Sequence, residues 1–163
     1  MKGQEALFSK VSDEWETPLW LFNQLNQEFH FDCDAAATDE NSLCGDGWLQ
    51  NALEDPWLKW KYRTFFLNPP YSKIAAFMQK AYEEALKGAT VVCLIPSRTD
   101  TVYWHNYCMK ASEIRFIKGR LKFLLGGNVQ PHGATFPSCI IIFDERMLRD
   151  NWNNPLICSM SKA

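Results

Sequence analysis

The run TVVCLIP at residues 90–96 constrains the fold more than any other segment of the chain. Its side chains are almost all β-branched or apolar, so the run has no polar face to turn toward water. A strand of this kind is typically buried on both faces, as in a parallel sheet that helices cover on each side. The sequence therefore predicts an α/β fold built around this strand.

Helix and strand patterns alternate along the rest of the chain. Apolar spacing predicts a helix over 18–28, with Thr17 as its N-cap and Pro18 at its first position. Ser72 can cap a second helix, which Gly88 would end. Further strands are expected at 29–36, up to Leu67, and at 114–117, 121–125 and 139–143, with residues 100–110 helical. This alternation predicts a mostly parallel, doubly wound sheet, with an antiparallel hairpin of the last strands at its edge.

Composition limits the protein class. With 163 residues, 47% of them hydrophobic, the chain fits one domain with a substantial core. The formal net charge of −2 argues against nucleic-acid affinity from global positive charge. Six cysteines without a CxxC pair favour reduced thiols over a metal site or disulfides. No signal-peptide pattern and no long apolar run are present, so we expect a cytoplasmic protein that does not enter a membrane.

The domain organisation is expected to be simple. We expect a flexible N-terminal arm over 1–12, one domain over 13–145, and a C-terminal tail over 146–163 that packs on the domain or trails from it.

The most informative segment is Asn68-Pro69-Pro70-Tyr71, directly after a predicted strand. The prolines fix the backbone and remove N–H donors, so the loop presents mainly acceptors. An amine between the Asn68 side-chain oxygen and the Pro69 carbonyl would donate both hydrogens and direct its lone pair at an electrophile. Tyr71 offers a ring on which a planar base could stack. The alternative is a structural Pro-Pro turn, which four residues alone do not exclude.

Acidic residues gather at a neighbouring strand end, in FDCDAAATDEN (31–41). Asp34 could accept hydrogen bonds from ribose hydroxyls or attract a sulfonium cation, and the small side chains of Ala35 and Ala36 allow a ligand to approach closely. Asp55 could contact the adenine amine of a cofactor, although a turn-forming Asp is equally plausible. No G-x-G motif or P-loop supports nicotinamide or nucleoside-triphosphate chemistry.

Together these segments resemble the phage-type DNA adenine-N6 methyltransferases, from about Asp13 to Phe143. The resemblance is carried by the order and spacing of DEWETP (13–18), FDCDAAATDEN (31–41), Asp55 with Trp57, LNPPYS (67–72), LIPSRTDT (94–101), IKGRLKF (117–123) and FPS (136–138). One departure is that DAAATDE (34–40) stands where many methyltransferases have a glycine-rich loop.

This resemblance implies a Rossmann-like methyltransferase fold in a single domain. It implies an enzyme that transfers a methyl group from S-adenosylmethionine to the N6 amine of adenine in DNA, without a metal. The residues at 68–71 would be the catalytic tetrad. The acidic strand-end segment would belong to the cofactor site, and Thr17 and Pro18 match an upstream element that helps to bind the cofactor.

An enzyme that acts on double-stranded DNA must contact phosphates and flip its target adenine out of the stack. Arg98, beside a strand end, is the first candidate for such a contact, followed by Arg120 and Lys118. The alternative is a solvated face with ordinary ion pairs, which we assign to Lys110 and Lys122.

Other functions stay open at this point. The same tetrad chemistry suits cytosine-N4, an adenine in RNA, or a glutamine side chain in a protein. A rival from another class is a catalytically inert nucleic-acid-binding module that keeps the fold, which predicts no binding of S-adenosylmethionine.

Overall fold

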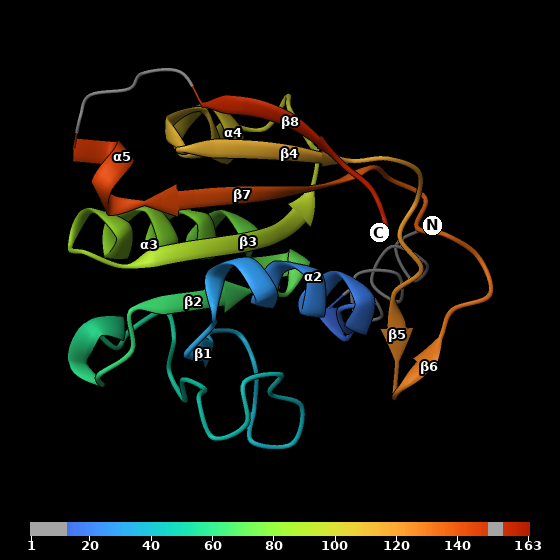
Figure 1. The fold of residues 1–163 in the computed structure, drawn as a ribbon, viewed down its shortest axis with the longest axis horizontal. Coiled ribbons are helices and arrows are strands. Elements are labelled where there is room, and N and C mark those ends of the chain that lie inside the picture. The colour runs from blue at the N-terminus through green and yellow to red at the C-terminus, as the bar shows by residue number, and fades with distance from the viewer. Residues whose placement is uncertain (1–12, 150–154) are drawn as a thin grey trace.

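The computed structural model of the chain describes residues 13–149 and 155–163 and shows one central sheet flanked by helices (Figure 1). The expected arm at 1–12 lies outside the described residues. The helices are α2 (Leu19–Phe29), α3 (Ile74–Leu86), α4 (Val102–Asn106) and α5 (Glu145–Arg149). The strands are β1 (Cys33–Asp34), β2 (Thr64–Leu67), β3 (Thr90–Pro96), β4 (Glu113–Ile117), β5 (Leu124–Leu125), β6 (Asn128–Val129), β7 (Ser138–Asp144) and β8 (Leu156–Met160).

The sheet has six strands in the order β1-β2-β3-β7-β4-β8. β1, β2 and β3 are parallel, with Cys33 opposite Phe65 and Leu67 opposite Cys93. β7 is antiparallel to both β3 and β4, and β8 is parallel to β4. Five strands therefore share one direction, which confirms the expectation of an α/β fold with a mostly parallel sheet.

The expected antiparallel hairpin at the sheet edge is wrong. The antiparallel strand β7 lies inside the sheet between β3 and β4, and the edge strand is β8. All seven residues of β7, SCIIIFD, are buried, so this strand needs neighbours on both sides and cover on both faces. The short hairpin that does form, β5–β6, is a separate two-stranded sheet that turns at Gly126 and Gly127.

Helices bury both faces of the sheet, as the run at 90–96 predicts. On one face α2 contributes Leu21, Phe22 and Leu25 to a core with Val92 and Leu94. On the other, α3 packs Phe77, Met78 and Ala81 with Val91 and Cys93. Alternate residues of β3 thus enter opposite cores, and burial of each such side chain contributes about 1.5–3 kcal/mol. The result is a rigid platform whose strand ends are fixed in place.

Two predicted helix caps and two predicted strand lengths are wrong. α2 begins at Leu19 with Pro18 in the N-cap position, and no side chain caps it. α3 has Lys73, not Ser72, in that position. The strand expected over 29–36 shortens to β1, because α2 continues to Phe29 and the chain turns after Asp34. The strand expected over 121–125 shortens to β5. Instead, the Thr17 hydroxyl accepts a hydrogen bond from Asn68, and the Ser72 N–H donates one to Asp13.

Sheet geometry brings the ends of several strands to one edge. β1 ends at Asp34, β2 is followed by Asn68, and β3 is followed by Ser97 and Arg98. β4 runs in the same direction and is followed there by Lys118. Residues 155–163, expected to be part of a tail, add β8 as the outermost strand of the sheet. Because β8 is parallel to β4, its carboxyl end lies on the same side as the other strand ends. Ligands of such sheets bind outside the carboxyl ends of the strands.

Candidate active site

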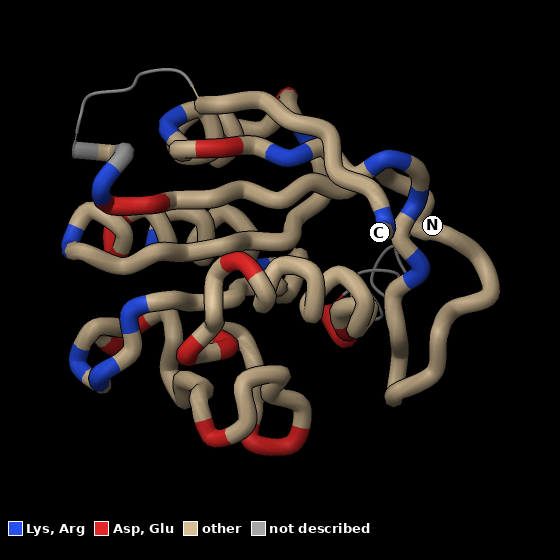
Figure 2. The backbone as a smooth tube through the Cα atoms, in the orientation of Figure 1, with Lys and Arg blue, Asp and Glu red and all other residues tan. Residues whose placement is uncertain are grey.

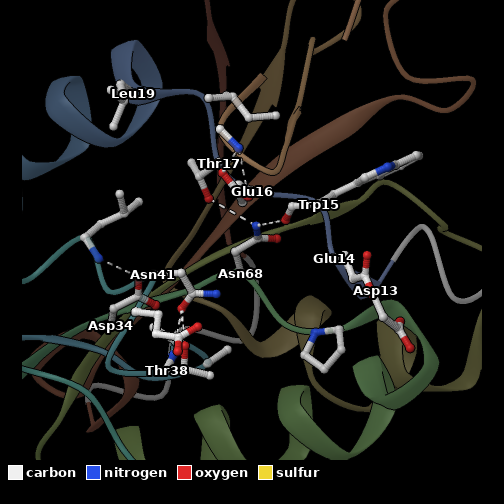
Figure 3. Close-up of a pocket in the computed structure, with 17 residues that line it drawn as sticks. Asp13, Glu14, Trp15, Glu16, Thr17, Leu19, Asp34, Thr38, Asn41 and Asn68 are labelled. Carbon is white, nitrogen blue, oxygen red and sulfur yellow. Dashed lines mark hydrogen bonds between the residues drawn. The ribbon is translucent and has the colours of Figure 1, made fainter. Parts of the chain in front are cut away.

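A pocket of about 640 Å³ opens beside the carboxyl ends of β1 and β2 (Figure 3). Three separate parts of the chain supply most of its wall: residues 13–17, the loop at 36–43, and Asn68 with Pro70. The β5–β6 hairpin adds Leu124 and Gly127. Small-molecule sites have volumes of roughly 300–1,000 Å³, so the pocket is large enough for a cofactor.

Asn68 is anchored by its amide nitrogen. Its Nδ2 donates to the Trp15 carbonyl at 2.9 Å and to the Thr17 hydroxyl oxygen at 3.1 Å. Figure 3 shows this nitrogen directed at the two partners and the amide oxygen turned away from them. That oxygen accepts no hydrogen bond from any described residue, so it is open to a donor from a ligand.

Residues 13–18, which we term the N-terminal strap, cross over the strand ends. Asp13 accepts a hydrogen bond from the backbone N–H of Ser72 at 2.9 Å, beyond the tetrad. Glu16 pairs with Leu124 through two backbone hydrogen bonds of 2.9 and 3.0 Å, and its carboxylate accepts from the Gly127 N–H at 3.2 Å. The strap is therefore tied to the tetrad on one side and to the β5–β6 hairpin on the other.

Aromatic rings hold Tyr71 beside the strap. Its ring meets Trp15 and Phe136 edge-on, with centroids 5.9 and 5.6 Å away. Trp15 in turn stacks on Phe123 at 5.2 Å and on Phe136 at 5.4 Å. The Tyr71 hydroxyl is buried without a hydrogen-bond partner among the described residues, and burial raises its pKa well above the usual value. Tyr71 is therefore protonated and packed between aromatic rings, and it is not part of the pocket lining.

Asp34 is the buried carboxylate of the pocket, with 6% of its surface exposed. Its Oδ2 accepts a hydrogen bond from the Leu43 N–H at 3.2 Å. Burial raises the pKa of the carboxyl from 3.8 to about 6, although backbone N–H groups partly offset this effect. At neutral pH the pocket therefore contains a poorly solvated negative charge, which favours a cationic ligand.

The lining as a whole is acidic. Its five carboxylate residues are Asp13, Glu14, Glu16, Asp34 and Glu40, and no described residue of the lining is Lys or Arg. We call this cavity the acidic pocket.

Among the described residues no group of His, Cys, Asp and Glu could hold a metal ion, and no described helix is long and apolar enough to span a membrane.

The structure brings several sequence-predicted residues together at the acidic pocket. Asn68, Pro70, Thr17, Asp34 and Ala36 line it. Their neighbours do not: the predicted tetrad member Pro69 and the predicted cofactor residue Ala35 are buried and are not part of the lining.

Other predicted residues lie elsewhere. Asp55 closes a turn with a backbone hydrogen bond to Asn51 and is not part of the lining. Arg98 is exposed after β3 and lines neither the acidic pocket nor a second pocket of about 540 Å³ beside it. Pro18, Lys118 and Arg120 line the second pocket, beside the first.

Sequence reasoning missed the three carboxylates of the strap, Asp13, Glu14 and Glu16, and also Lys162 in the second pocket. The segment DEWETP contained a usable signal, since three acidic residues precede the assigned Thr17 within it. For Lys162 no local signal exists, because it reaches the site only through the pairing of β8 with β4.

The sequence of the chain is similar to that of one protein family and of two phage proteins. Residues 4–161 match the family model described as DNA N-6-adenine-methyltransferase (Dam). A DNA N-6-adenine-methyltransferase of Escherichia phage T1 is 33% identical over 121 residues, covering 72% of this chain and 50% of that protein. One of Haemophilus phage HP1 (strain HP1c1) is 29% identical over 124 residues, covering 71% and 70%. The chain thus spans about half the length of the T1 relative. No solved structure matches it.

Proposed function

Because the chain belongs to the DNA N-6-adenine-methyltransferase (Dam) family, we propose that it transfers a methyl group from S-adenosylmethionine to the N6 amine of adenine in DNA. We further propose that it does so as a single Rossmann-like methyltransferase domain. The observation that carries the proposal is the orientation of Asn68, whose nitrogen is anchored to the strap and whose oxygen is open beside the acidic pocket.

The acidic pocket fits the cofactor by charge and size. S-adenosylmethionine supplies, when bound, an electrophilic methyl group on a sulfonium cation. Asp34, Glu16 and the other carboxylates of the lining favour a cation over an anion, and a phosphate-bearing cofactor would be repelled. Ala36 leaves room for close approach, and Thr17 lies between the pocket and Asn68. These residues are the ones that would hold the cofactor.

The tetrad would bind the exocyclic amine of a flipped adenine. The oxygen of Asn68 and the carbonyl of Pro69 can each accept one N–H, and the prolines offer no competing donor. Two such bonds favour a more tetrahedral nitrogen and localise the lone pair that the ring otherwise delocalises. Tyr71, held edge-on by Trp15 and Phe136, would provide a rigid wall against the base. The chain's part is to position and polarise the amine, which needs no side-chain base before transfer.

Asn68→Ala tests this proposal, with the exposed Asn23 of α2 as the site of a matched Asn→Ala control. The variant should lose about 10²–10³-fold in methyl transfer to DNA, because an aligned acceptor is removed. Calorimetric binding of S-adenosylmethionine should persist. Equal turnover in variant, control and parent would reject the role of Asn68.

The nature of the product tests the remaining functions. Labelled methyl transfer followed by nucleoside analysis should yield N6-methyladenine in DNA. N4-methylcytosine as the only product, or transfer to RNA or protein alone, would reject the assignment. A parent protein that binds DNA but not S-adenosylmethionine would support the inert module instead.

A further inference from the structure

A second cavity of about 540 Å³ adjoins the acidic pocket and has the opposite charge. Its lining includes four cations, Lys118, Arg120, Lys122 and Lys162, and no acidic residue. We call it the basic groove. Figure 2 shows Lys and Arg positions gathered near the C-terminal end of the chain, next to the β5–β6 hairpin. In a chain of net charge −2, this local excess is not a consequence of composition.

The four cations are exposed, and none of them forms an ion pair with another described residue. The ion pairs of the described residues involve Lys80, Lys87, Arg115 and Arg146, none of which lies in the groove. Among the described residues, one groove cation has its charged group over an aromatic ring: the Nζ of Lys162 lies 6.0 Å from the centroid of the Trp20 ring. Like charges gathered without partners raise the local positive potential, which favours an anionic ligand.

The cations stand on a fixed backbone. In the segment at 120–123 exposed and buried residues alternate: Arg120 and Lys122 are exposed, whereas Leu121 and Phe123 are 3% and 2% exposed. Two backbone hydrogen bonds tie the segment to residues 130–134, since Leu121 accepts from Ala134 at 2.7 Å and Phe123 from Gln130 at 2.9 Å. Another, from the Lys118 N–H to the Met160 carbonyl at 2.8 Å, brings the chain end near. The groove is therefore prearranged.

The groove and the acidic pocket share a boundary. Leu19 and Leu124 line both cavities. The basic groove therefore begins where the acidic pocket ends. The carboxylates repel phosphates and the cations attract them, so the paired potentials separate the backbone of a nucleic acid from the methyl-donor site.

We propose that the basic groove binds the phosphates of the DNA strand that flanks the flipped adenine. This inference rests on the proposed function and adds Lys122 and Lys162 to the expected contacts. It also moves the main phosphate site away from Arg98, which is exposed outside both cavities. Phosphate contacts of this kind fix the register of an enzyme on DNA without selecting its sequence.

The test compares two pairs of substitutions in the full chain. Lys118→Gln with Lys122→Gln removes two charges from the groove. As the control, Lys59→Gln with Lys61→Gln removes two charges from exposed positions that precede β2, near the amino end of that strand. Binding of a short labelled duplex is measured by fluorescence anisotropy over a series of salt concentrations, and thermal unfolding confirms that each protein is folded.

The groove pair should weaken duplex binding by about tenfold near 0.1 M salt and lower the slope of log affinity against log salt by about 2. The control pair should change neither quantity by a comparable amount. Equal affinities and slopes in the two pairs would overturn the inference. A third variant, Arg98→Gln, would also overturn it if it lost duplex affinity while the groove pair did not. Tighter, lysine-dependent binding to phosphatidylserine vesicles than to the duplex would overturn it too.

Failure of the groove and failure of the proposed function give different results. If the parent methylates adenine and the groove pair binds DNA normally, the groove inference alone fails. If the parent transfers no methyl group but the groove pair still loses DNA affinity and slope, the groove stands and the proposed function fails. Calorimetric binding of S-adenosylmethionine should be the same in all of these proteins, because the substituted lysines lie outside the acidic pocket.

Discussion

The amide nitrogen of Asn68 lies 3.1 Å from the hydroxyl oxygen of Thr17, which precedes it by 51 residues in the chain. This bond and the one to the Trp15 carbonyl fix which end of the amide is left for a ligand. The reversed amide would place its oxygen against a carbonyl oxygen, which is repulsive. The N-terminal strap therefore prepares Asn68 to accept a hydrogen bond, and Thr17 acts as a positioning residue.

Thr17→Val should lower the turnover of methyl transfer by about two- to tenfold, because one net hydrogen bond contributes about 0.5–1.5 kcal/mol. Thr17→Ser, which keeps the acceptor, should retain the parent turnover. Separate measurement of kcat and of the Kd for S-adenosylmethionine distinguishes the two roles of this residue. A variant with normal kcat and weaker cofactor binding would show that Thr17 contacts the cofactor and does not position Asn68.

Binding of S-adenosylmethionine should weaken as the pH is lowered through about 6. Burial raises the pKa of Asp34 to about 6, so its carboxylate becomes protonated in that range and no longer attracts a cation. Calorimetry between about pH 5 and 8 checks this expectation. Asp34→Asn should bind weakly at every pH in the series, and a parent affinity that stays constant down to pH 5 would contradict the role of Asp34.

The same burial should reduce stability at neutral pH. The folded pKa of Asp34 lies above the unfolded value near 3.8, so its favourable contribution is fully present below about pH 4 and is lost as the pH rises through 6. The difference is on the order of 3 kcal/mol. Asp34→Asn should therefore raise the free energy of unfolding in urea at pH 7.5, while the exposed Asp39→Asn leaves it unchanged. A less stable Asp34→Asn protein would refute this account.

Glu84 is a second buried carboxylate, but it is paired. It is 0% exposed, accepts from Lys80 and Lys87 at 3.0 Å each, and accepts from the backbone N–H of Trp57 at 3.3 Å. Burial raises its pKa, but the two lysines outweigh that effect and hold the pKa below 4.5, so the group stays ionised at neutral pH.

Glu84→Ala should destabilise the fold by about 3 kcal/mol in chemical denaturation, because two lysines and a backbone donor lose their partner. Its neighbour Glu83 is exposed on the same helix and makes Glu83→Ala the matched control, with an expected change below about 0.5 kcal/mol. Similar losses in both variants would contradict the buried cluster as the cause of the effect, since alanine is itself a strong helix former.

Local pattern determined much of this protein. The apolar run at 90–96 forms the buried strand β3, the spacing of Leu21, Phe22 and Leu25 forms α2, and the tetrad follows β2 as expected. These features depend on residues close in sequence. The hydrophobicity and backbone preference of each residue are properties of the local sequence. The same local reasoning placed Asp34 at a strand end.

Only the tertiary structure decided the order of the strands and which distant residues meet at the site. A local pattern carries no information on strand order, so it did not reveal that β7 lies inside the sheet or that β8 brings Lys162 beside Lys118. Thr17 suited a helix cap equally well by sequence. Its hydroxyl turned instead to Asn68, because the strap crosses the strand ends once the sheet is assembled.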